Sequence, residues 1–267
     1  MRMNEIKIVE QLDRGLAYAE ACFETFRVLD GHIFQQAEHQ QRLKYALESY
    51  GLICTDNELE NCFKEAISAA NIQGNDMLVR MTVSGGDAAW GLLAKNTQPH
   101  VQIQMMPSAN RYPLHLQSVI WPFPLREKKV KYTADYAESL RAIQQWGLDN
   151  PMQALIGSNS GNVLSTLTAN IAIYRQGQWF TPQGLGILSG VVRHFLLQQG
   201  VLFESVCPMA WLDDCEAVAC MNSGVFVQPV ASLNGRGLDV NHPAMSKLFS
   251  AFKGMSGVPT LGVLNRE

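Results

Sequence analysis

The sequence Gly186-Ile187-Leu188-Ser189-Gly190-Val191-Val192-Arg193 joins a glycine-led turn to an apolar stretch, which predicts a helix over 190–199. A helix that begins after a small residue presents unpaired backbone N–H groups at the positive end of its dipole. These groups can bind an anion such as phosphate, yet most helix starts of this kind bind nothing. The stretch alone therefore leaves a phosphate site and an ordinary helix start both open.

Two further short stretches have the same ambiguity. Asn222-Ser223-Gly224 follows an apolar strand, where a hydroxyl beside glycine can serve a phosphate but a plain turn is the simpler interpretation. Lys131, with Tyr136 five residues later, could place an amine beside a phenol at a strand end. Its spacing alone favours an ordinary solvated lysine.

Hydrophobic periodicity supplies the surrounding elements. A helix over 38–50 is indicated by Leu43, Ala46, Leu47 and Tyr50 at helical spacing, and Thr55 with Glu58 forms a capping box for a second helix. Asp30-Gly31 predicts a hairpin turn. A further helix is expected over 134–146. Strands are expected over 16–29, 77–84, 101–105, 116–121, 152–156, 171–174, 203–206 and 217–221.

This mixture predicts an α+β protein with two domains. The stretch 107–113 is irregular and rich in turn-forming residues, so we take it as the linker. We expect a small N-terminal α+β domain over residues 1–110 and a larger C-terminal domain over residues 111–267.

Taken together and in order, five stretches between about Tyr18 and Val230 resemble the class IV aminotransferase family. That family includes branched-chain and D-amino-acid aminotransferases and 4-amino-4-deoxychorismate lyase. The stretches are YAEACFETFRVLDG (18–31), HQQRL (39–43), KYTADY (131–136), ILSGVVR (187–193) and NSGVFVQPV (222–230). The chain departs from the family pattern at Ala19 and Glu20, where glycine and aspartate are usual, and at Asp135, where asparagine is usual.

The resemblance implies the two-domain fold of the fold type IV, D-amino-acid aminotransferase-like enzymes, in which a small N-terminal α/β domain precedes a larger mixed, barrel-like sheet. It also implies pyridoxal 5′-phosphate (PLP) as the cofactor and Lys131 as the catalytic residue that bonds to the PLP aldehyde and then moves the proton at the substrate carbon. A lysine suits this role because its unprotonated amine attacks carbonyls and burial can lower its pKa.

The remaining cofactor contacts are implied in the same way. Tyr136 would hydrogen-bond the phenolic oxygen of PLP, and Leu188 would pack beneath its ring. The phosphate would be held by the Arg42 guanidinium, by the N–H groups of Val191 and Val192, and by the Ser223 hydroxyl. Val192 stands where threonine is usual, so one hydroxyl is lost while the backbone donor remains.

Ser165 occupies the position at which the family places a glutamate on the pyridine nitrogen of PLP. No acid lies between Asp149 and Glu204, so a small shift in alignment cannot supply one. A neutral hydroxyl leaves the nitrogen less protonated and the ring a weaker electron sink. Elimination tolerates this better than transamination, which must return the proton to a different carbon.

These features predict a PLP-dependent lyase similar to 4-amino-4-deoxychorismate lyase, which releases pyruvate and p-aminobenzoate for folate biosynthesis. One alternative is an aminotransferase of branched-chain or D-amino acids. Another is a non-catalytic relative that has lost its cofactor function.

The substrate contacts are less defined. Where many relatives carry two arginines in a glycine-rich stretch, Gly85 and Trp90 stand here. The remaining candidates for binding a substrate carboxylate are Arg27, Arg80, Arg111 and Arg126, each of which is more simply read as a surface or structural arginine.

The composition limits the kinds of ligand and partner that we expect. The 267 residues have a formal net charge of −3 and no basic stripe, so we expect no nucleic acid. No apolar run approaches a membrane span. The six cysteines form no C-x-x-C pair, so we expect reduced thiols in a cytoplasmic protein and no metal site. The resemblance implies a homodimer that acts on a small amino substrate.

Overall fold

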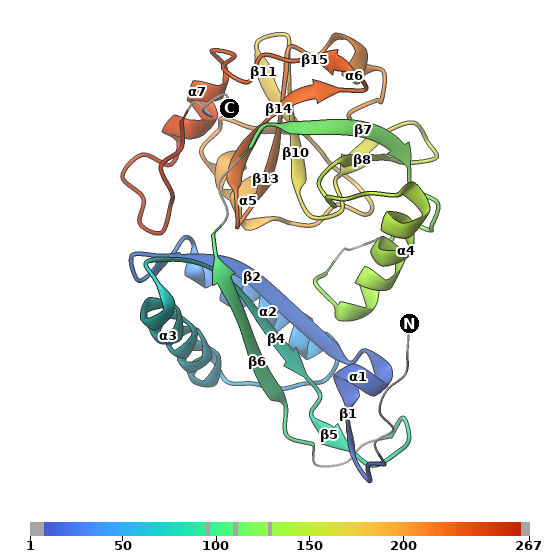
Figure 1. Ribbon diagram of the computed structural model, residues 1–267, viewed down its shortest axis with the longest axis vertical. Helices are drawn as coiled ribbons and strands as arrows, with labels where there is room; N and C mark the ends of the chain where they lie inside the picture. Colours follow the sequence, from blue (N-terminus) through green and yellow to red (C-terminus); the bar gives the residue numbers. More distant parts are fainter. Residues whose placement is uncertain (1–7, 94–96, 109–111, 128–129, 263–267) are drawn as a thin grey trace.

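The structure is a computed structural model that describes residues 8–93, 97–108, 112–127 and 130–262. Two sheets lie one above the other in Figure 1: a four-stranded sheet from residues 21–107 and a nine-stranded sheet from residues 114–237. The mixed α and β content, with a smaller sheet before a larger one, agrees with the α+β fold that the sequence predicted. The predicted domain division falls at 110–111, outside the described residues, and stays a prediction. No helix in the described ranges is long and apolar enough to cross a membrane.

The four-stranded sheet is antiparallel throughout, in the order β3-β2-β4-β6. Two helices pack against one face of it. The strands are β2 (Ala21–Leu29), β3 (His32–Ile33), β4 (Asp76–Ser84) and β6 (His100–Pro107), and the helices are α2 (Gln36–Ser49) and α3 (Asp56–Gln73).

The side chains of β4 alternate between the two faces of the sheet. Met77, Val79, Met81 and Val83 are buried in the core with the apolar faces of the two helices. The residues between them, among them Arg80, point to the opposite face of the sheet because side chains alternate along a strand.

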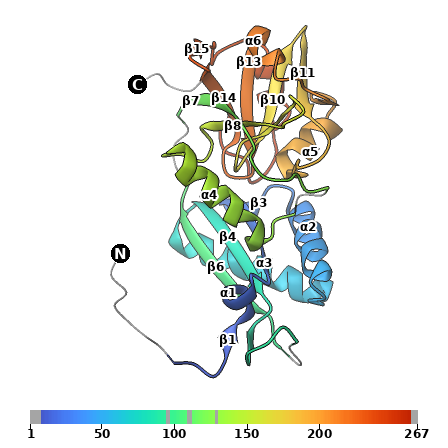
Figure 2. The same cartoon turned by 90° about the vertical axis from the view of Figure 1, so that its right-hand side faces the viewer.

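The nine-stranded sheet has the order β12-β11-β10-β13-β14-β7-β8-β9, with β15 paired to β14. Its strands are β7 (Leu114–Ile120), β8 (Ala154–Gly157), β9 (Val163–Ser165), β10 (Asn170–Arg175), β11 (Gln178–Pro182), β12 (Phe203–Ser205), β13 (Ala217–Asn222), β14 (Phe226–Leu233) and β15 (Arg236–Gly237). The 3₁₀ turn η1 (Thr133–Asp135) leads into α4 (Tyr136–Trp146), which lies at the level where the two units meet (Figures 1 and 2). The other helices of this unit are α5 (Val191–Gln198), α6 (Trp211–Asp214) and α7 (Met245–Ser250).

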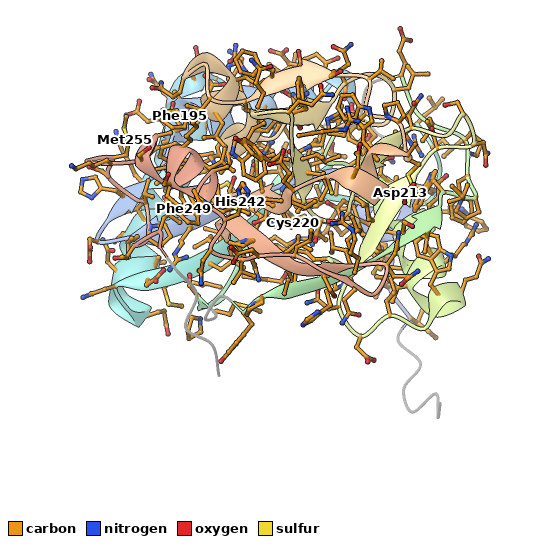
Figure 3. All side chains as sticks on the ribbon, turned by 90° about the horizontal axis from the view of Figure 1, so that it is seen from above. Phe195, Asp213, Cys220, His242, Phe249 and Met255 are labelled. Carbon is orange, nitrogen blue, oxygen red and sulfur yellow. The ribbon has the colours of Figure 1, made fainter. Side chains whose placement is uncertain are left out.

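The core of the larger unit includes a cluster of aromatic side chains from α5, α7 and the segment after α7. Phe195 and Phe249 lie on the same side of the molecule in Figure 3. Phe34, which follows the β2–β3 hairpin of the smaller unit, inserts into this cluster, with its ring centroid 4.9 Å from Phe195, 5.3 Å from Phe226 and 5.5 Å from Phe252. One side chain of the smaller unit thus belongs to the core of the larger one.

Most predicted elements are confirmed within one or two residues at their ends. Asp30 and Gly31 have φ of 48° and 75°, as a hairpin turn between twisted strands requires. The Thr55–Glu58 capping box is present, with both reciprocal bonds formed. The sequence did not predict β9, β11 or α7.

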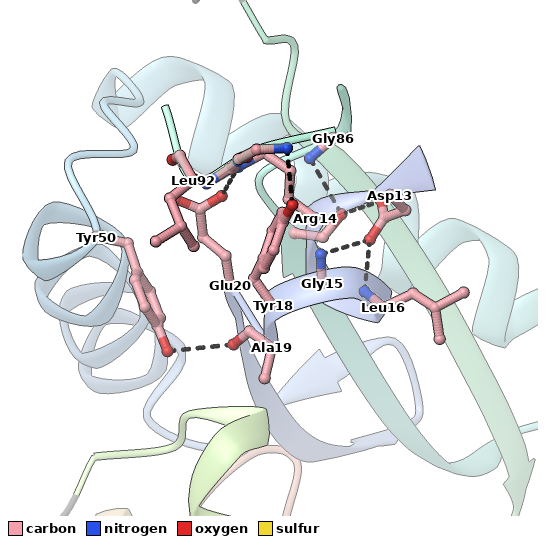
Figure 4. A network of polar contacts seen from close by, with 12 residues as sticks. Asp13, Arg14, Gly15, Leu16, Tyr18, Ala19, Glu20, Tyr50, Gly86 and Leu92 are labelled. Carbon is pink, nitrogen blue, oxygen red and sulfur yellow. Dashed lines mark hydrogen bonds and ion pairs between the residues drawn. The ribbon is translucent and has the colours of Figure 1, made fainter. Parts of the chain in front are cut away.

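The strand predicted over 16–29 is wrong at its beginning. Residues Arg14–Tyr18 form the short helix α1, because the Asp13 carboxylate accepts the N–H groups of Gly15 (2.8 Å) and Leu16 (3.3 Å). Ala19 then adopts φ of 54°, and β2 begins only at Ala21. Figure 4 shows these contacts.

The same region anchors an exposed loop. Buried Arg14 pairs with Glu20 and donates to the carbonyls of Gly91 (3.2 Å) and Leu92 (3.1 Å) (Figure 4). Asp13 also belongs to a short antiparallel pair, β1 (Leu12–Asp13) with β5 (Asp87–Ala88). Trp90 stands where many members of the resembling family carry an arginine. Its side chain is 99% exposed, which is too exposed to bind a substrate within its own chain.

The Phe34→Ala substitution should lower the free energy of unfolding by about 3–5 kcal/mol, because it removes a buried ring from the cluster that joins the two units. Urea unfolding measures this. Ile53→Ala, at a site that is 88% exposed, is the matched control and should change the value by less than about 0.5 kcal/mol. Equal effects of the two substitutions would contradict the joining role of Phe34.

Candidate active site

A cavity of about 540 Å³ is lined by residues from both units. It brings together all eight residues that the sequence singled out. They are Arg42 from α2, Lys131, Tyr136 at the start of α4, Ser165 at the end of β9, Leu188, Val191 and Val192 at the start of α5, and Ser223 after β13. Their roles remain predictions, but positions up to 181 residues apart along the chain, from Arg42 to Ser223, converge on one site.

Lys131 is held to the smaller sheet by its backbone. Its carbonyl accepts the N–H of Phe23 at 2.9 Å, and Tyr132 forms an isolated antiparallel bridge with Cys22. The Lys131 amine lies 5.1 Å from the centre of the Phe23 ring. Burial lowers its pKa to about 8, and the positive charges of Arg42 and Arg80 act in the same direction, against the opposing effect of Glu24. Near neutral pH a useful fraction of the amine is therefore unprotonated and nucleophilic.

Arg42 is fixed by a buried acid. Its Nε and Nη2 donate to the two carboxylate oxygens of Glu24 at 2.6 and 2.7 Å, and its Nη1 donates to the Ser189 carbonyl at 2.8 Å. Burial alone would raise the pKa of Glu24, but Arg42 and His39, whose Nδ1 lies 2.8 Å from the carboxylate, hold that pKa well below its usual range. Burial lowers the pKa of His39, which keeps its ring neutral near pH 7.

Sequence reasoning assigned no role to Glu24. The signal was present, because one carboxylate stands in the otherwise largely apolar strand ACFETFRVL. A buried acid needs a cationic partner, and the HQQRL helix carries one.

The start of α5 leaves donors free for an anion. No side chain caps this helix at Gly190, and Val191 and Val192 line the cavity. A side chain at Gly190 would collide with Asn170, because a Cβ there would lie 2.1 Å from its Oδ1. The Asn170 amide also donates to the Leu188 carbonyl at 3.0 Å, so it fixes the turn that precedes the helix.

The turn after β13 completes this end of the cavity. The Asn222 side-chain oxygen accepts the N–H groups of Gly224 and Val225, both at 2.9 Å, which closes a tight turn. Ser223 lies within this turn and lines the cavity. The turn interpretation of Asn222-Ser223-Gly224 is confirmed, and the site role of Ser223 stays a prediction with which its place in the cavity lining is compatible.

Tyr136 and Ser165 line the same cavity. Burial raises the pKa of Tyr136, so its phenol stays protonated and can donate a hydrogen bond. The Tyr136 ring packs edge-on against Phe23, with centroids 5.0 Å apart. Ser165 is buried, and among the described residues no aspartate or glutamate lines this cavity.

A second, larger space of about 1560 Å³ adjoins the first and shares Lys131, Tyr136 and Ser223 with it. Arg80 lines this space with its guanidinium carbon 3.8 Å from the centre of the Phe23 ring. Its one side-chain bond is a long contact of 3.4 Å to the Thr82 hydroxyl, and no carboxylate pairs with it in the described ranges. Arg80 is thus available to a carboxylate ligand.

The other candidate arginines are engaged or not described. Arg27 pairs with Asp76 and donates to the Gly224 carbonyl, and Arg126 lies 3.1 Å from Asp135. Arg111 lies outside the described residues. Sequence alone could not separate Arg80 from these three.

The donor set fits PLP group by group. A buried amine of lowered pKa suits an aldehyde, and a protonated phenol suits a phenolic oxygen. A fixed guanidinium, an uncapped helix start and a hydroxyl suit a phosphate.

Comparison with known proteins agrees with this geometry. The model of the family "Amino-transferase class IV" matches residues 21–233. A putative aminodeoxychorismate lyase of Schizosaccharomyces pombe is 30% identical over 189 residues, which cover 68% of this chain and 75% of that protein.

Two solved structures share the fold. A putative 4-amino-4-deoxychorismate lyase from Legionella pneumophila has a TM-score of 0.74 and 23% identity, covering 92% of this chain and 94% of that one. The PLP-bound form of a hypothetical aminotransferase from Mycobacterium tuberculosis has a TM-score of 0.74 and 17% identity, covering 95% of both chains.

The Arg42→Lys variant should bind PLP about tenfold more weakly, because lysine cannot keep the two-pronged contact with Glu24 and still reach a phosphate. Its affinity for pyridoxal, which lacks the phosphate, should stay unchanged. Quenching of intrinsic fluorescence measures both affinities. Arg141→Lys on the exposed face of α4 is the matched control, and an equal loss for PLP and pyridoxal would argue against a phosphate contact.

Proposed function

Because this chain belongs to the class IV aminotransferase family, whose cofactor is PLP, we propose that it is a PLP-dependent lyase of the 4-amino-4-deoxychorismate lyase type. The observation that carries the proposal is the position of Lys131. Lys131 lines both the cavity at the start of α5 and the larger space that Arg80 lines.

The chain's own residues would divide the work as follows. PLP, when bound, supplies an aldehyde that condenses with amines and a ring that withdraws electrons from the substrate carbon. Lys131, in its unprotonated form, holds the cofactor and then accepts or returns the proton at that carbon. Tyr136 donates to the phenolic oxygen, and Arg42, the α5 start and Ser223 orient the phosphate. Arg80 binds a substrate carboxylate in the larger space.

Elimination is favoured over amino transfer by the group at position 165. Ser165 offers a hydroxyl where a carboxylate would hold the ring nitrogen fully protonated, so less negative charge can be stored on the ring. Elimination expels the leaving group and needs less negative charge to be stored on the ring. With 4-amino-4-deoxychorismate as substrate, loss of pyruvate also creates the aromatic ring of p-aminobenzoate, which adds driving force. The name of the S. pombe relative supports this choice of reaction.

Amino transfer is the second candidate. Its support is the similarity to the M. tuberculosis protein described as a hypothetical aminotransferase and the presence of Arg80, which could equally bind the α-carboxylate of an amino acid. The two candidates differ in product: pyruvate without an amino acceptor, or a new amino acid formed from 2-oxoglutarate or pyruvate.

Purified protein with PLP should release pyruvate and p-aminobenzoate from 4-amino-4-deoxychorismate, and Lys131→Ala should lower kcat by roughly a thousandfold or more. Lys64→Ala, at a surface lysine that pairs with Glu60, is the matched control and should retain full activity. Lys131→Ala with undiminished pyruvate release would contradict the proposal. Amino transfer from a panel of branched-chain and D-amino acids, without pyruvate release, would shift it to the second candidate.

The proposal extends to a homodimer in the cytoplasm. All six cysteines are free thiols, which suits a reducing compartment, and Trp90 and Leu93 are almost fully exposed on the loop anchored by Arg14. Sedimentation equilibrium at micromolar concentration should give twice the chain mass of 29.6 kDa. A single-chain mass there would contradict the dimer.

A further inference from the structure

A third cavity, of about 480 Å³, lies directly behind Ser165. Ser165 lines both this cavity and the one that holds Lys131. The far cavity is also lined by Asp135, Glu138, Ser139 and Arg126. Buried Ser165 thus borders both the proposed cofactor cavity, which no described acid lines, and a cavity that two acids line.

We propose that Asp135 supplies, through Ser165, the negative charge that keeps the cofactor's ring nitrogen protonated. The inference rests on the cofactor site proposed above and adds a positioning residue to it. Asp135 does not contact the cofactor itself. The acid that is missing at position 165 is supplied from behind it, at a position where the family resemblance led us to expect asparagine.

The Asp135 carboxylate is placed for this role by its neighbours. It lies at the end of the 3₁₀ turn directly before Tyr136, whose side chain lines the cofactor cavity. Its side chain makes no capping bond to α4, so the carboxylate is not used in closing the helix. It is instead turned into the cavity behind Ser165, with a side-chain exposure of 5%.

Arg126, one partner of the Asp135 carboxylate, is largely exposed to solvent. Arg126 lies 3.1 Å from Asp135, but its side chain is 51% exposed, so water screens its charge. The buried carboxylate is screened much less than Glu138, which lines the same cavity but is only partly buried. Burial is the main reason that the pKa of Tyr136 is raised; Arg80 and Arg42 act to lower this pKa, and Glu24 and Asp135 act to raise it.

The proton arrangement follows from donor and acceptor roles. The Ser165 oxygen would accept a hydrogen bond from the ring nitrogen, and the Ser165 hydroxyl would donate toward Asp135. Ser139 and Arg126 line the same cavity, so a water there would find polar partners. The Asp135 carboxylate does not contact the ring nitrogen, so it stabilises the protonated nitrogen less than an acid at position 165 would. The weaker stabilisation remains consistent with elimination.

The test compares two probes: PLP and its 1-deaza analogue, in which carbon replaces the ring nitrogen. Asp135→Asn should weaken PLP binding about tenfold, the equivalent of one charge-assisted hydrogen bond, and leave binding of the analogue nearly unchanged. Ser165→Ala should have the same selective effect. The double variant should lose no more than either single variant, because both substitutions interrupt one chain of contacts. Fluorescence quenching gives each dissociation constant without any turnover.

Two further variants sharpen the result. Glu138→Gln is the matched control in the same cavity and should bind both probes as the parent does. Ser165→Glu placed in the Asp135→Asn background should restore PLP affinity, because it moves the acid back to the nitrogen.

The contrary results are distinct. An equal loss of both probes in Asp135→Asn would mean that this residue only supports the start of α4, and the inference would be overturned. A selective loss in Glu138→Gln instead would assign the role to the other acid and also overturn it. If the parent protein bound neither probe, the proposed cofactor site itself would fail, and this inference with it.

Discussion

The paired carboxylate and guanidinium of Glu24 and Arg42 connect the parts of this molecule that form the site. Glu24 is fully buried on β2, and Arg42 crosses from α2 to meet it with two nitrogens while a third reaches the Ser189 carbonyl before α5. Loss of either partner would leave a buried charge uncompensated, at a cost of about 3–5 kcal/mol. The neighbouring residue on the same strand, Phe23, donates its N–H to the Lys131 carbonyl. Two consecutive residues of one strand thus position both the Arg42 guanidinium and the backbone of Lys131.

Most of the fold could be predicted from the sequence, whereas the roles of the site residues stay predictions. Ordered short motifs were enough to collect eight residues that line one cavity, because each motif carries a local geometry such as a helix start or a tight turn. It did not separate Arg80 from Arg27, because both stand on strands with similar patterns and only pairing in space distinguishes them. Arg27 meets Asp76, whereas Arg80 has no acid in reach among the described residues.

The predicted strand at Leu16 failed for a local reason. A capping aspartate and a left-handed Ala19 outweighed the apolar pattern. The short strands β9 and β11 were missed because three to five residues give too little periodicity to recognise. The cavity that Asp135 and Ser165 both line could not be predicted from the sequence either. The two residues are thirty positions apart, and nothing in either local pattern relates them.

This arrangement suggests how electron demand can be tuned without changing the fold. In the proposed arrangement, the strand that ends at Ser165 borders the cofactor cavity, and the negative charge comes from Asp135 on the turn before α4. Relative to the family pattern, position 165 has a hydroxyl in place of an acid and position 135 has an acid in place of an amide. Together these two changes would weaken the electron withdrawal by the ring without abolishing it. Such a site is suited to a reaction that expels a group and gains aromatic stabilisation.

The central claim is that Lys131 holds PLP in this cavity. Its most direct test is the absorbance of the purified protein with and without added PLP, followed by borohydride reduction and peptide mass mapping. The account predicts a band at roughly 330–430 nm and a phosphopyridoxyl mass fixed on the peptide that carries Lys131. No band and no adduct in excess PLP, or an adduct confined to another lysine, would contradict it.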